Sequence, residues 1–227
     1  MELLSEYLES YEGRDKFIGI LSYTAKLATI LPLSDSTMNK KLRIFGRQMS
    51  NCRVIYRLLD DIPALHYAIK YGWGEKESDR VIRWLELLSR WTDVISSPVE
   101  TISWLGEHKL ISVNDDKWDN ISTWLWIISI NLTLLKSLRH YSKLVHYKNK
   151  KVDKESSSVK KYNCMIKNEL IKCTRSVLDL SYAVNYLPKG TLWGGQLLTW
   201  QVGALGVLSS SIGLYQTLSR RASRKST

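Results

Sequence analysis

The sequence predicts an all-α protein with an amphipathic helical N-terminal half plus one or two membrane-spanning helices. Two observations lead to this prediction. Almost every segment repeats its apolar residues at spacings of three and four, and almost none alternates as a strand does. In addition, the stretch from Gly190 to Ser219 carries no charged side chain, although 24% of all residues are charged. The length of 227 residues suits one compact unit rather than two full domains.

Region 1–115 is expected to consist of amphipathic helices joined by short turns. Proline and glycine mark these turns, notably at Pro32 and Gly72, and Pro98 is expected to kink the last helix. The predicted helices are 2–30, 39–59, 64–71 and 79–105. The last of them has one apolar face, formed by Val81, Trp84, Leu85, Leu88, Trp91, Val94, Ile95, Val99 and Ile102.

The rest of the chain is expected to contain the membrane-spanning helices. Crossing the hydrocarbon core takes about 20 apolar residues at a rise of about 1.5 Å each, so the uncharged C-terminal segment is long enough. The uncharged run between Asp119 and Lys136 covers only about 24 Å, and it is interpreted either as a short first span or as a half-inserted helix. Four segments are thus predicted: an apolar helix and possible first span at 116–147, a basic connection and helix at 148–190, the C-terminal span at 191–219 and a basic tail at 220–227.

Helix 39–59 has the clearest functional pattern of the N-terminal half. Its predicted membrane-inserting stripe is Leu42, Phe45, Met49, Cys52, Ile55, Tyr56 and Leu59. Its predicted lipid headgroup-binding cations are Lys40, Lys41, Arg43, Arg47, Arg53 and Arg57. Such a helix lies in the plane of a membrane, with its apolar side in the acyl boundary and its cations over anionic headgroups. A soluble bundle helix whose basic side meets water shows the same pattern, so the residues alone leave both interpretations open.

Small residues recur at spacings of three and four along the predicted C-terminal span: Thr199, Gly203, Gly206, Ser210, Gly213 and Thr217. In lipid, burial of apolar surface no longer drives helices together, and small side chains let two backbones approach closely. The pattern therefore predicts helix–helix association between copies of the chain. The competing interpretation is that glycine is simply frequent in membrane helices.

Catalysis leaves no recognisable pattern in the sequence. The four histidines are scattered, and no nucleophile motif or phosphate-binding glycine loop is present. No enzyme activity, metal or cofactor is predicted, and the three cysteines are expected to be reduced thiols. The many basic residues and the nine tryptophans fit nucleic-acid binding by charge and stacking. That class is set aside, because it leaves the uncharged C-terminal stretch unexplained.

Four short motifs lie in order along nearly the whole chain: Tyr11–Lys16, Cys52–Asp61, Trp118–Trp126 and Asn185–Gly195. Together they resemble the peroxin-11 family of peroxisomal membrane proteins, and in particular its gamma type. The resemblance implies residence in the peroxisomal membrane and elongation of that membrane before division. It also implies association with the same or related family members and with the fission machinery, a tail-anchored adaptor and a dynamin-like GTPase. The family's membrane-remodelling amphipathic helix maps best onto helix 39–59.

The resemblance also implies an alternative function, a small-solute channel of the peroxisomal membrane. The predicted spans offer only amides and hydroxyls to line such a pore, which weakens this alternative. The protein is expected to be integral to the membrane, with much of the chain exposed to the cytosol. Targeting is expected to depend on membrane segments, because the chain ends Arg-Lys-Ser-Thr rather than Ser-Lys-Leu.

Overall fold

The computed structural model describes residues 2–30, 36–58, 60–151 and 156–225. Within these ranges it contains helices and no strand, which confirms the all-α prediction. The elements are α1 (Glu2–Glu9), α2 (Tyr11–Ala28), α3 (Ser36–Arg57), α4 (Asp61–Tyr71), α5 (Arg80–Glu107), α6 (Asp115–Lys151), α7 (Ser156–Ala183), the 3-10 helix η1 (Val184–Tyr186) and α8 (Thr199–Lys225).

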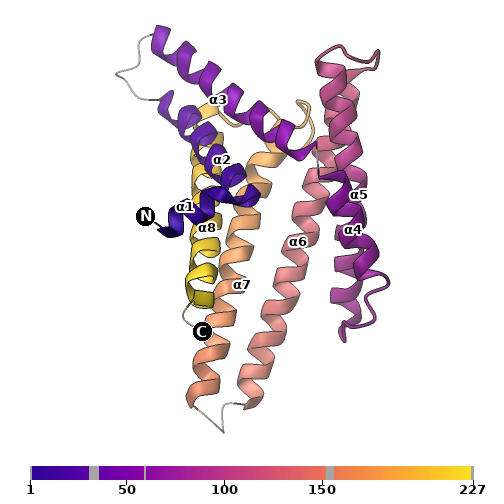
Figure 1. Cartoon of the computed structure of the whole chain (residues 1–227), viewed down its shortest axis with the longest axis vertical. Coiled ribbons are helices and arrows are strands. Elements are labelled where there is room, and N and C mark those ends of the chain that lie inside the picture. Colours follow the sequence, from indigo (N-terminus) through magenta and orange to yellow (C-terminus); the bar gives the residue numbers. More distant parts are fainter. Residues whose placement is uncertain (1, 31–35, 59, 152–155, 226–227) are drawn as a thin grey trace.

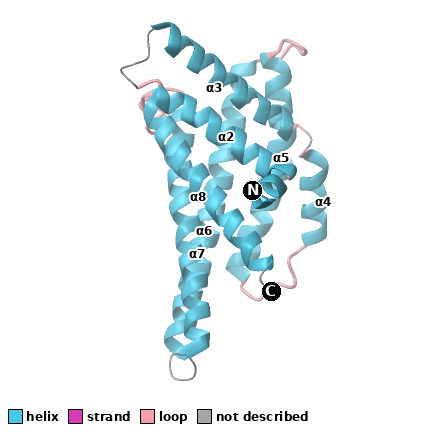
Figure 2. Ribbon diagram, turned by 60° about the vertical axis from the view of Figure 1, so that its left-hand side comes forward, coloured by secondary structure: helices cyan, strands magenta, loops and turns pink. Residues whose placement is uncertain are grey.

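The helices form an elongated bundle, and α3 crosses one end of it (Figure 1). Helix α5 packs against α6, α6 against α7, and α7 against α8. On the other side of α8 lies α2, which carries α3, while α4 packs against α5. The α5–α6 loop and the turn before α8 lie at the same end as α3. At the opposite end the α6–α7 hairpin projects beyond the other helices, as both views show (Figure 1 and Figure 2).

Two clusters of buried apolar side chains fix the helices relative to one another. The first joins α6 to the end of α7 and to η1, and it consists of Ile127, Ile130, Ala183, Val184 and Leu187. The second joins α2, α7 and α8 through Tyr23, Tyr182 and Val202. In the second cluster the Tyr23 and Tyr182 rings meet edge to face at 5.4 Å, an arrangement that contributes about 0.5–1.5 kcal/mol beyond burial.

Several predicted boundaries shift in the structure. Ser10 divides the predicted helix 2–30, because its hydroxyl caps α2 by accepting a hydrogen bond from the Gly13 amide at 3.2 Å. The predicted helix 39–59 begins earlier, at Ser36, and ends at Arg57, while Leu59 lies outside the described residues. Much of the predicted basic connection is helical, since α6 runs to Lys151 and α7 begins at Ser156.

The predicted C-terminal span 191–219 corresponds to a helix that starts later in the structure. Helix α8 begins only at Thr199, because the preceding residues turn: Gly190, Leu192 and Gly195 adopt φ values of 94°, 51° and 67°. Among the described helices, α6 is the one that is long and apolar enough to cross a membrane. The sequence favours the later segment because it lacks charge, but its glycines, serines and glutamines lower its apolar content. The predicted possible first span is therefore the stronger of the two.

Candidate membrane interface

Helix α3 is held across the end of the bundle by a close contact with α2. The contact centres on Gly46, where an added Cβ would lie 3.3 Å from the carbonyl oxygen of Ser22. The Ser22 hydroxyl donates a hydrogen bond to the Gly46 carbonyl oxygen at 2.9 Å. Glycine lowers the helix propensity of an isolated helix by up to about 1 kcal/mol relative to alanine. Here its lack of a side chain allows the two backbones to approach.

Two of the six predicted headgroup-binding cations form ion pairs within the protein. The guanidinium of Arg53 donates two hydrogen bonds to the Asp15 carboxylate of α2, from Nε to Oδ1 at 2.9 Å and from Nη2 to Oδ2 at 3.3 Å. Burial opposes the charge of Arg53, but the hydrogen bonds and charge of Asp15 outweigh burial and raise the pKa of Arg53. Arg57 pairs with Glu100 of α5 at 2.5 Å. These two arginines therefore fasten α3 to the bundle, and their guanidinium groups face neighbouring helices.

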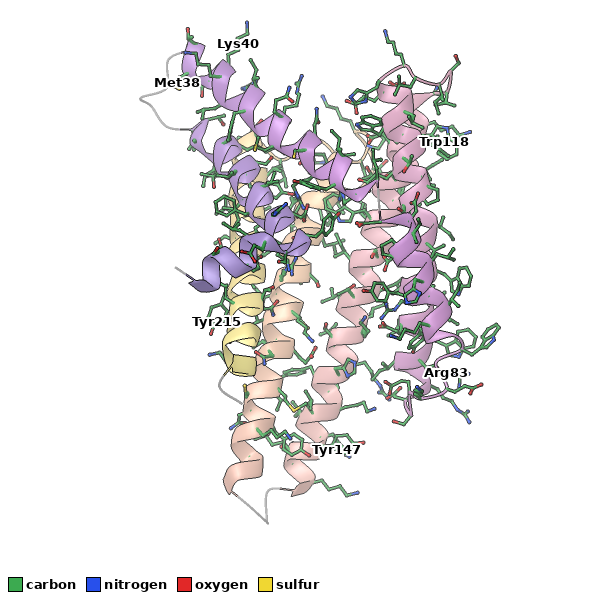
Figure 3. All side chains as sticks on the ribbon, viewed as in Figure 1. Met38, Lys40, Arg83, Trp118, Tyr147 and Tyr215 are labelled. Atoms are coloured by element: carbon green, nitrogen blue, oxygen red, sulfur yellow. The ribbon has the colours of Figure 1, made fainter. Side chains whose placement is uncertain are left out.

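The other four predicted cations lie on the exposed side of α3: Lys40, Lys41, Arg43 and Arg47. Figure 3 shows Met38 and Lys40 near the free end of the helix, away from the bundle. Phe45 and Ile55 of the predicted apolar stripe are exposed. The remaining described members of the stripe are half-buried: Leu42, Met49, Cys52 and Tyr56. In this structure, therefore, the four cations are open to solvent, whereas most of the apolar stripe is half-buried.

The small-residue face of α8 makes a close helix contact, but its partner is α2 of the same chain. A Cβ added at Gly203 would lie 2.5 Å from the Leu27 backbone nitrogen, and one at Gly206 would lie 2.3 Å from the Tyr23 ring. Farther along the face, Gly213 lies beneath the Arg175 guanidinium of α7.

Three hydroxyl residues complete that face. Thr217 accepts a hydrogen bond from Lys16 of α2 at 3.2 Å, Ser210 is half-buried, and Thr199 is exposed at the start of the helix. The glycines are therefore occupied within the monomer. A second copy cannot reach them while this packing persists, and their use in association between copies stays a prediction.

Helices α5 and α6 meet along a row of polar contacts that sequence reasoning missed. Asp79, Glu86 and Asp93 recur at every seventh position and face α6. Their partners on α6 run in the opposite direction. Asp79 binds Arg139 and Lys143 at 3.1 and 3.3 Å, Glu86 binds Lys136 at 2.5 Å, and Asp93 accepts a hydrogen bond from Ser129 at 3.3 Å. We call this row the polar seam, and its seven-residue spacing was the signal that could have revealed it.

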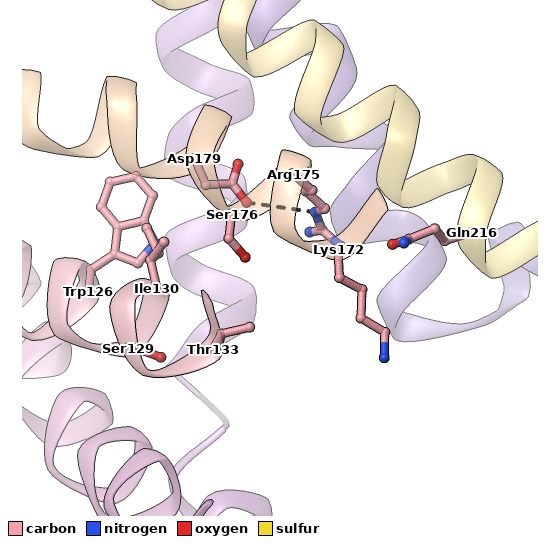
Figure 4. Close-up of a pocket in the computed structure, with 9 residues that line it drawn as sticks. All are labelled: Trp126, Ser129, Ile130, Thr133, Lys172, Arg175, Ser176, Asp179 and Gln216. Atoms are coloured by element: carbon pink, nitrogen blue, oxygen red, sulfur yellow. Dashed lines mark ion pairs between the residues drawn. The ribbon is translucent and has the colours of Figure 1, made fainter. Parts of the chain in front are cut away.

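A polar cavity of about 340 Å³ opens between α6, α7 and α8 (Figure 4). Arg175 and Asp179 pair across one wall at 3.7 Å. Asp179 also accepts hydrogen bonds from Ser209 and Tyr182. Gln216 lines the cavity from α8, where its side chain is buried and its amide nitrogen has no hydrogen-bond partner within the described residues. The cavity therefore offers both charges and an amide donor to a small polar molecule.

Comparison with known proteins decides the family. The family profile described as "Peroxisomal biogenesis factor 11 (PEX11)" matches residues 1–218. The chain belongs to the PEX11 family. The resemblance drawn from the four motifs is thereby confirmed, and membership makes the chain a peroxisomal membrane protein with a general role in peroxisome biogenesis and division.

Two PEX11 relatives are similar over nearly their full lengths. Peroxisomal membrane protein 11C of Homo sapiens is 30% identical over 222 residues, which cover 94% of this chain and 92% of the relative. Peroxisomal membrane protein 11C of Mus musculus is 32% identical over 231 residues, which cover 98% of this chain and 95% of the relative. No solved structure matches the chain.

The PEX11-like motifs meet in the folded chain. The Asp15–Arg53 ion pair joins the first motif to the second. The third and fourth motifs meet where the rings of Trp126 and Tyr186 lie 6.1 Å apart. In the fourth motif, Asn185 holds the turn before α8, because its side-chain oxygen accepts a hydrogen bond from the Leu197 amide at 2.8 Å. The motifs that identify PEX11 therefore maintain the arrangement of α2, α3, α6 and α8.

Proposed function

We propose that this protein elongates the peroxisomal membrane before division by placing α3 in one leaflet as a wedge. The observation that carries the proposal is the group of exposed cations on a helix that lies across the end of the bundle: Lys40, Lys41, Arg43 and Arg47. Each cation near an anionic membrane surface contributes about 1 kcal/mol. Together they are sufficient to hold α3 at the headgroups.

Tryptophans at the same end of the bundle support this placement. Trp104 lies near the end of α5, Trp118 near the start of α6, and Trp193 in the turn before α8. Tryptophan rings accumulate at the headgroup level, where one part of the ring is apolar and the other is hydrated. From this level α6 would continue across the bilayer as the anchor, since it has the length and composition of a span. The protein would thus be integral, with α3 on the cytosolic surface.

The wedge would act in two steps. In the packed state Leu42 and Met49 are half-buried beside α2, whereas Phe45 is exposed. We expect the cations to bind the anionic surface first and α3 then to part from α2, so that Leu42, Phe45 and Met49 enter the acyl boundary. Insertion into one leaflet expands that leaflet relative to the other, and the area difference favours curvature. The role is mechanical rather than catalytic and requires no cofactor.

Division requires partners, and these form part of the proposal. Association with other copies and with related family members would concentrate many wedges on one membrane segment. The fission machinery, a tail-anchored adaptor and a dynamin-like GTPase, would then cut the elongated membrane. Because α2 occupies the glycines of α8, contacts between copies would use another surface.

The test uses the full-length chain reconstituted in vesicles of phosphatidylcholine and phosphatidylserine. Wild-type protein should convert round vesicles into tubules visible by electron microscopy, while Phe45→Glu should float with the vesicles and leave them round. The chain contains only one other phenylalanine, Phe17, which is also exposed, so Phe17→Glu is the matched control and should tubulate. Tubulation by Phe45→Glu at the wild-type level would sink the wedge mechanism.

A small-solute channel is the second candidate, and the polar cavity between α6, α7 and α8 is the observation that favours it. A pathway through this cavity would use the Arg175–Asp179 pair and Gln216 as polar lining. The same reconstituted vesicles, loaded with a small fluorescent anion, separate the two candidates. Tubulation without efflux supports the wedge, and efflux that Gln216→Leu abolishes supports the channel.

A further inference from the structure

Helix α5 has its charged and apolar sides in unusual positions. Its acidic residues at seven-residue spacing point toward the protein, where the polar seam pairs them with α6. A helix turns about 100° per residue, so residues that follow an acid by two, five or nine positions lie on the opposite side. Those positions hold Val81, Trp84, Leu88, Trp91 and Ile95. Each of these five side chains is exposed, with an exposed fraction between 49% and 57%.

This arrangement is the reverse of that in a water-soluble bundle. In water, an amphipathic helix turns its apolar stripe to the core and its charges outward. Inside a bilayer, ionisable side chains face the bundle interior and pair with one another, while apolar side chains face the lipid. The five exposed residues, which we call the outer stripe, recur at spacings of three and four without an intervening charge on that side. Helix α5 thus follows the membrane pattern.

The outer stripe lies at the same levels of the bundle as an exposed apolar surface of α6. The Asp93–Ser129 and Glu86–Lys136 contacts fix the levels at which the two helices pair. Around these levels α6 exposes its own large apolar side chains: Trp124, Ile128, Leu135 and Leu138. Both helices of the pair therefore present apolar exteriors over the same length of the bundle.

The length of α5 also matches a bilayer. Its 28 residues extend about 42 Å at about 1.5 Å each, close to the 40–45 Å of a bilayer with its headgroups. Tryptophan stands near both ends, as in the aromatic belts of membrane proteins. Trp104 lies near the end of the helix, and Trp73 precedes its start in the α4–α5 loop, where it is exposed.

We propose that α5 lies in the hydrocarbon of the bilayer beside α6, with the outer stripe against lipid acyl chains. The membrane-embedded unit is then the α5–α6 hairpin, and the polar seam is its internal contact. The acyl chains of the bilayer are the occupant of this face, since the stripe lies at the same levels as the exposed apolar side chains of α6, the helix that can cross the membrane. This inference goes beyond the wedge, which requires only α3 and an anchor.

The test measures the surroundings of the outer stripe directly. Cys52, Cys164 and Cys173 are replaced by serine, and a nitroxide spin label is attached to one new cysteine at a time, at Trp84→Cys, Leu88→Cys or Trp91→Cys. The full-length chain is reconstituted in vesicles of phosphatidylcholine and phosphatidylserine. Collision of the label with oxygen, which concentrates in hydrocarbon, is compared with collision with a water-soluble nickel chelate. The matched control is Leu110→Cys in the α5–α6 loop, which is exposed outside both helices.

Labels on the outer stripe should collide with oxygen at least tenfold more than with nickel, whereas the label at position 110 should favour nickel. Equal nickel access at positions 88 and 110 would place the stripe in water and overturn the proposal. Labels that neither reagent reaches, with spectra broadened by spins of a second molecule, would identify a second copy as the occupant and also overturn it. Both outcomes are distinct from a failure of the wedge, which appears as absent tubulation.

Discussion

Gly46 of α3 lies against Ala25 of α2 so closely that a Cβ at Gly46 would be 3.4 Å from that of Ala25. This separation is near the 3.5–4.5 Å between the Cβ atoms of a disulfide. A disulfide between these two positions could therefore hold α3 on α2. It also offers a test of whether α3 must leave α2 to act.

The first prediction concerns this lock. Ala25→Cys combined with Gly46→Cys, in a chain whose native cysteines are serine, should form a disulfide on oxidation. Because the half-buried stripe then stays against α2, oxidised protein should bind anionic vesicles but lose tubulation, and reductant should restore it. Each single cysteine variant serves as the control and should be insensitive to oxidant. Full tubulation by the oxidised double variant would show that the wedge needs no separation from α2.

The second prediction separates the cations that fasten α3 from those available to lipid. Arg43→Ala with Arg47→Ala should weaken vesicle binding by about 2 kcal/mol, or about thirtyfold, since each surface cation contributes about 1 kcal/mol. The loss should shrink at high salt, where charge interactions are screened. Arg53→Ala should instead leave vesicle affinity nearly unchanged and increase protease cleavage between α2 and α3. Equal losses of vesicle affinity in both variants would contradict this division.

The third prediction concerns the close packing of α2 and α8. Gly206→Leu should lower the free energy of unfolding by about 1–3 kcal/mol or more, because a larger side chain must displace the Tyr23 ring. Denaturant unfolding in detergent micelles measures this loss. Ser211→Leu, at an exposed position of the same helix, should change stability little. A Gly206→Leu protein that keeps its stability but cross-links less between copies would contradict this prediction and show that the small-residue face of α8 mediates self-association.

The fourth prediction concerns acid. Burial opposes ionisation of Asp79, but the backbone amides at the start of α5 and the α6 cations outweigh it and lower the pKa from 3.8 to about 2. A lowered pKa means that the carboxylate stabilises the fold above about pH 4 and that this contribution fades as the pH falls toward 2. Asp79→Asn should therefore flatten the decline of Tm between pH 4 and pH 2.5. Asp61→Asn, at an exposed residue, should keep the wild-type decline, and equal slopes in all three proteins would refute the assignment.

The spacing of apolar residues predicted the helices well, because a repeat of three and four residues can be recognised from neighbouring positions in the sequence alone. It therefore revealed helix 39–59 and the apolar face of the helix after Asp79. It could not reveal what covers each stripe. Helix α5 carries an apolar stripe and an acidic row on opposite sides. The basic residues of α6 decide which side turns inward, and they lie far away in the sequence: Lys136 follows its partner Glu86 by 50 positions.

The same limit explains the small-residue face of α8. Its spacing predicted a close helix contact, and such a contact exists. The partner, however, is Tyr23 and Leu27 of α2, which lie at the other end of the sequence. Nothing in the local pattern of α8 distinguishes a partner in the same chain from a second copy. The turn before Thr199 was missed for another reason: Leu192 adopts a left-handed conformation that sequence rarely signals outside glycine.

The Arg57–Glu100 pair gives α3 a fixed point at one end only. If the middle of the helix parts from α2, this ion pair still joins its last turn to α5, so α3 swings about that point as a lever does about its pivot. The arm from Arg57 to Met38 measures about 28 Å at about 1.5 Å per residue, and its far end carries Lys40 and Lys41. In the proposed wedge, a small rotation about Arg57 would move the basic tip a long way through the headgroups, and tension in that leaflet would be transmitted through α3 to α5.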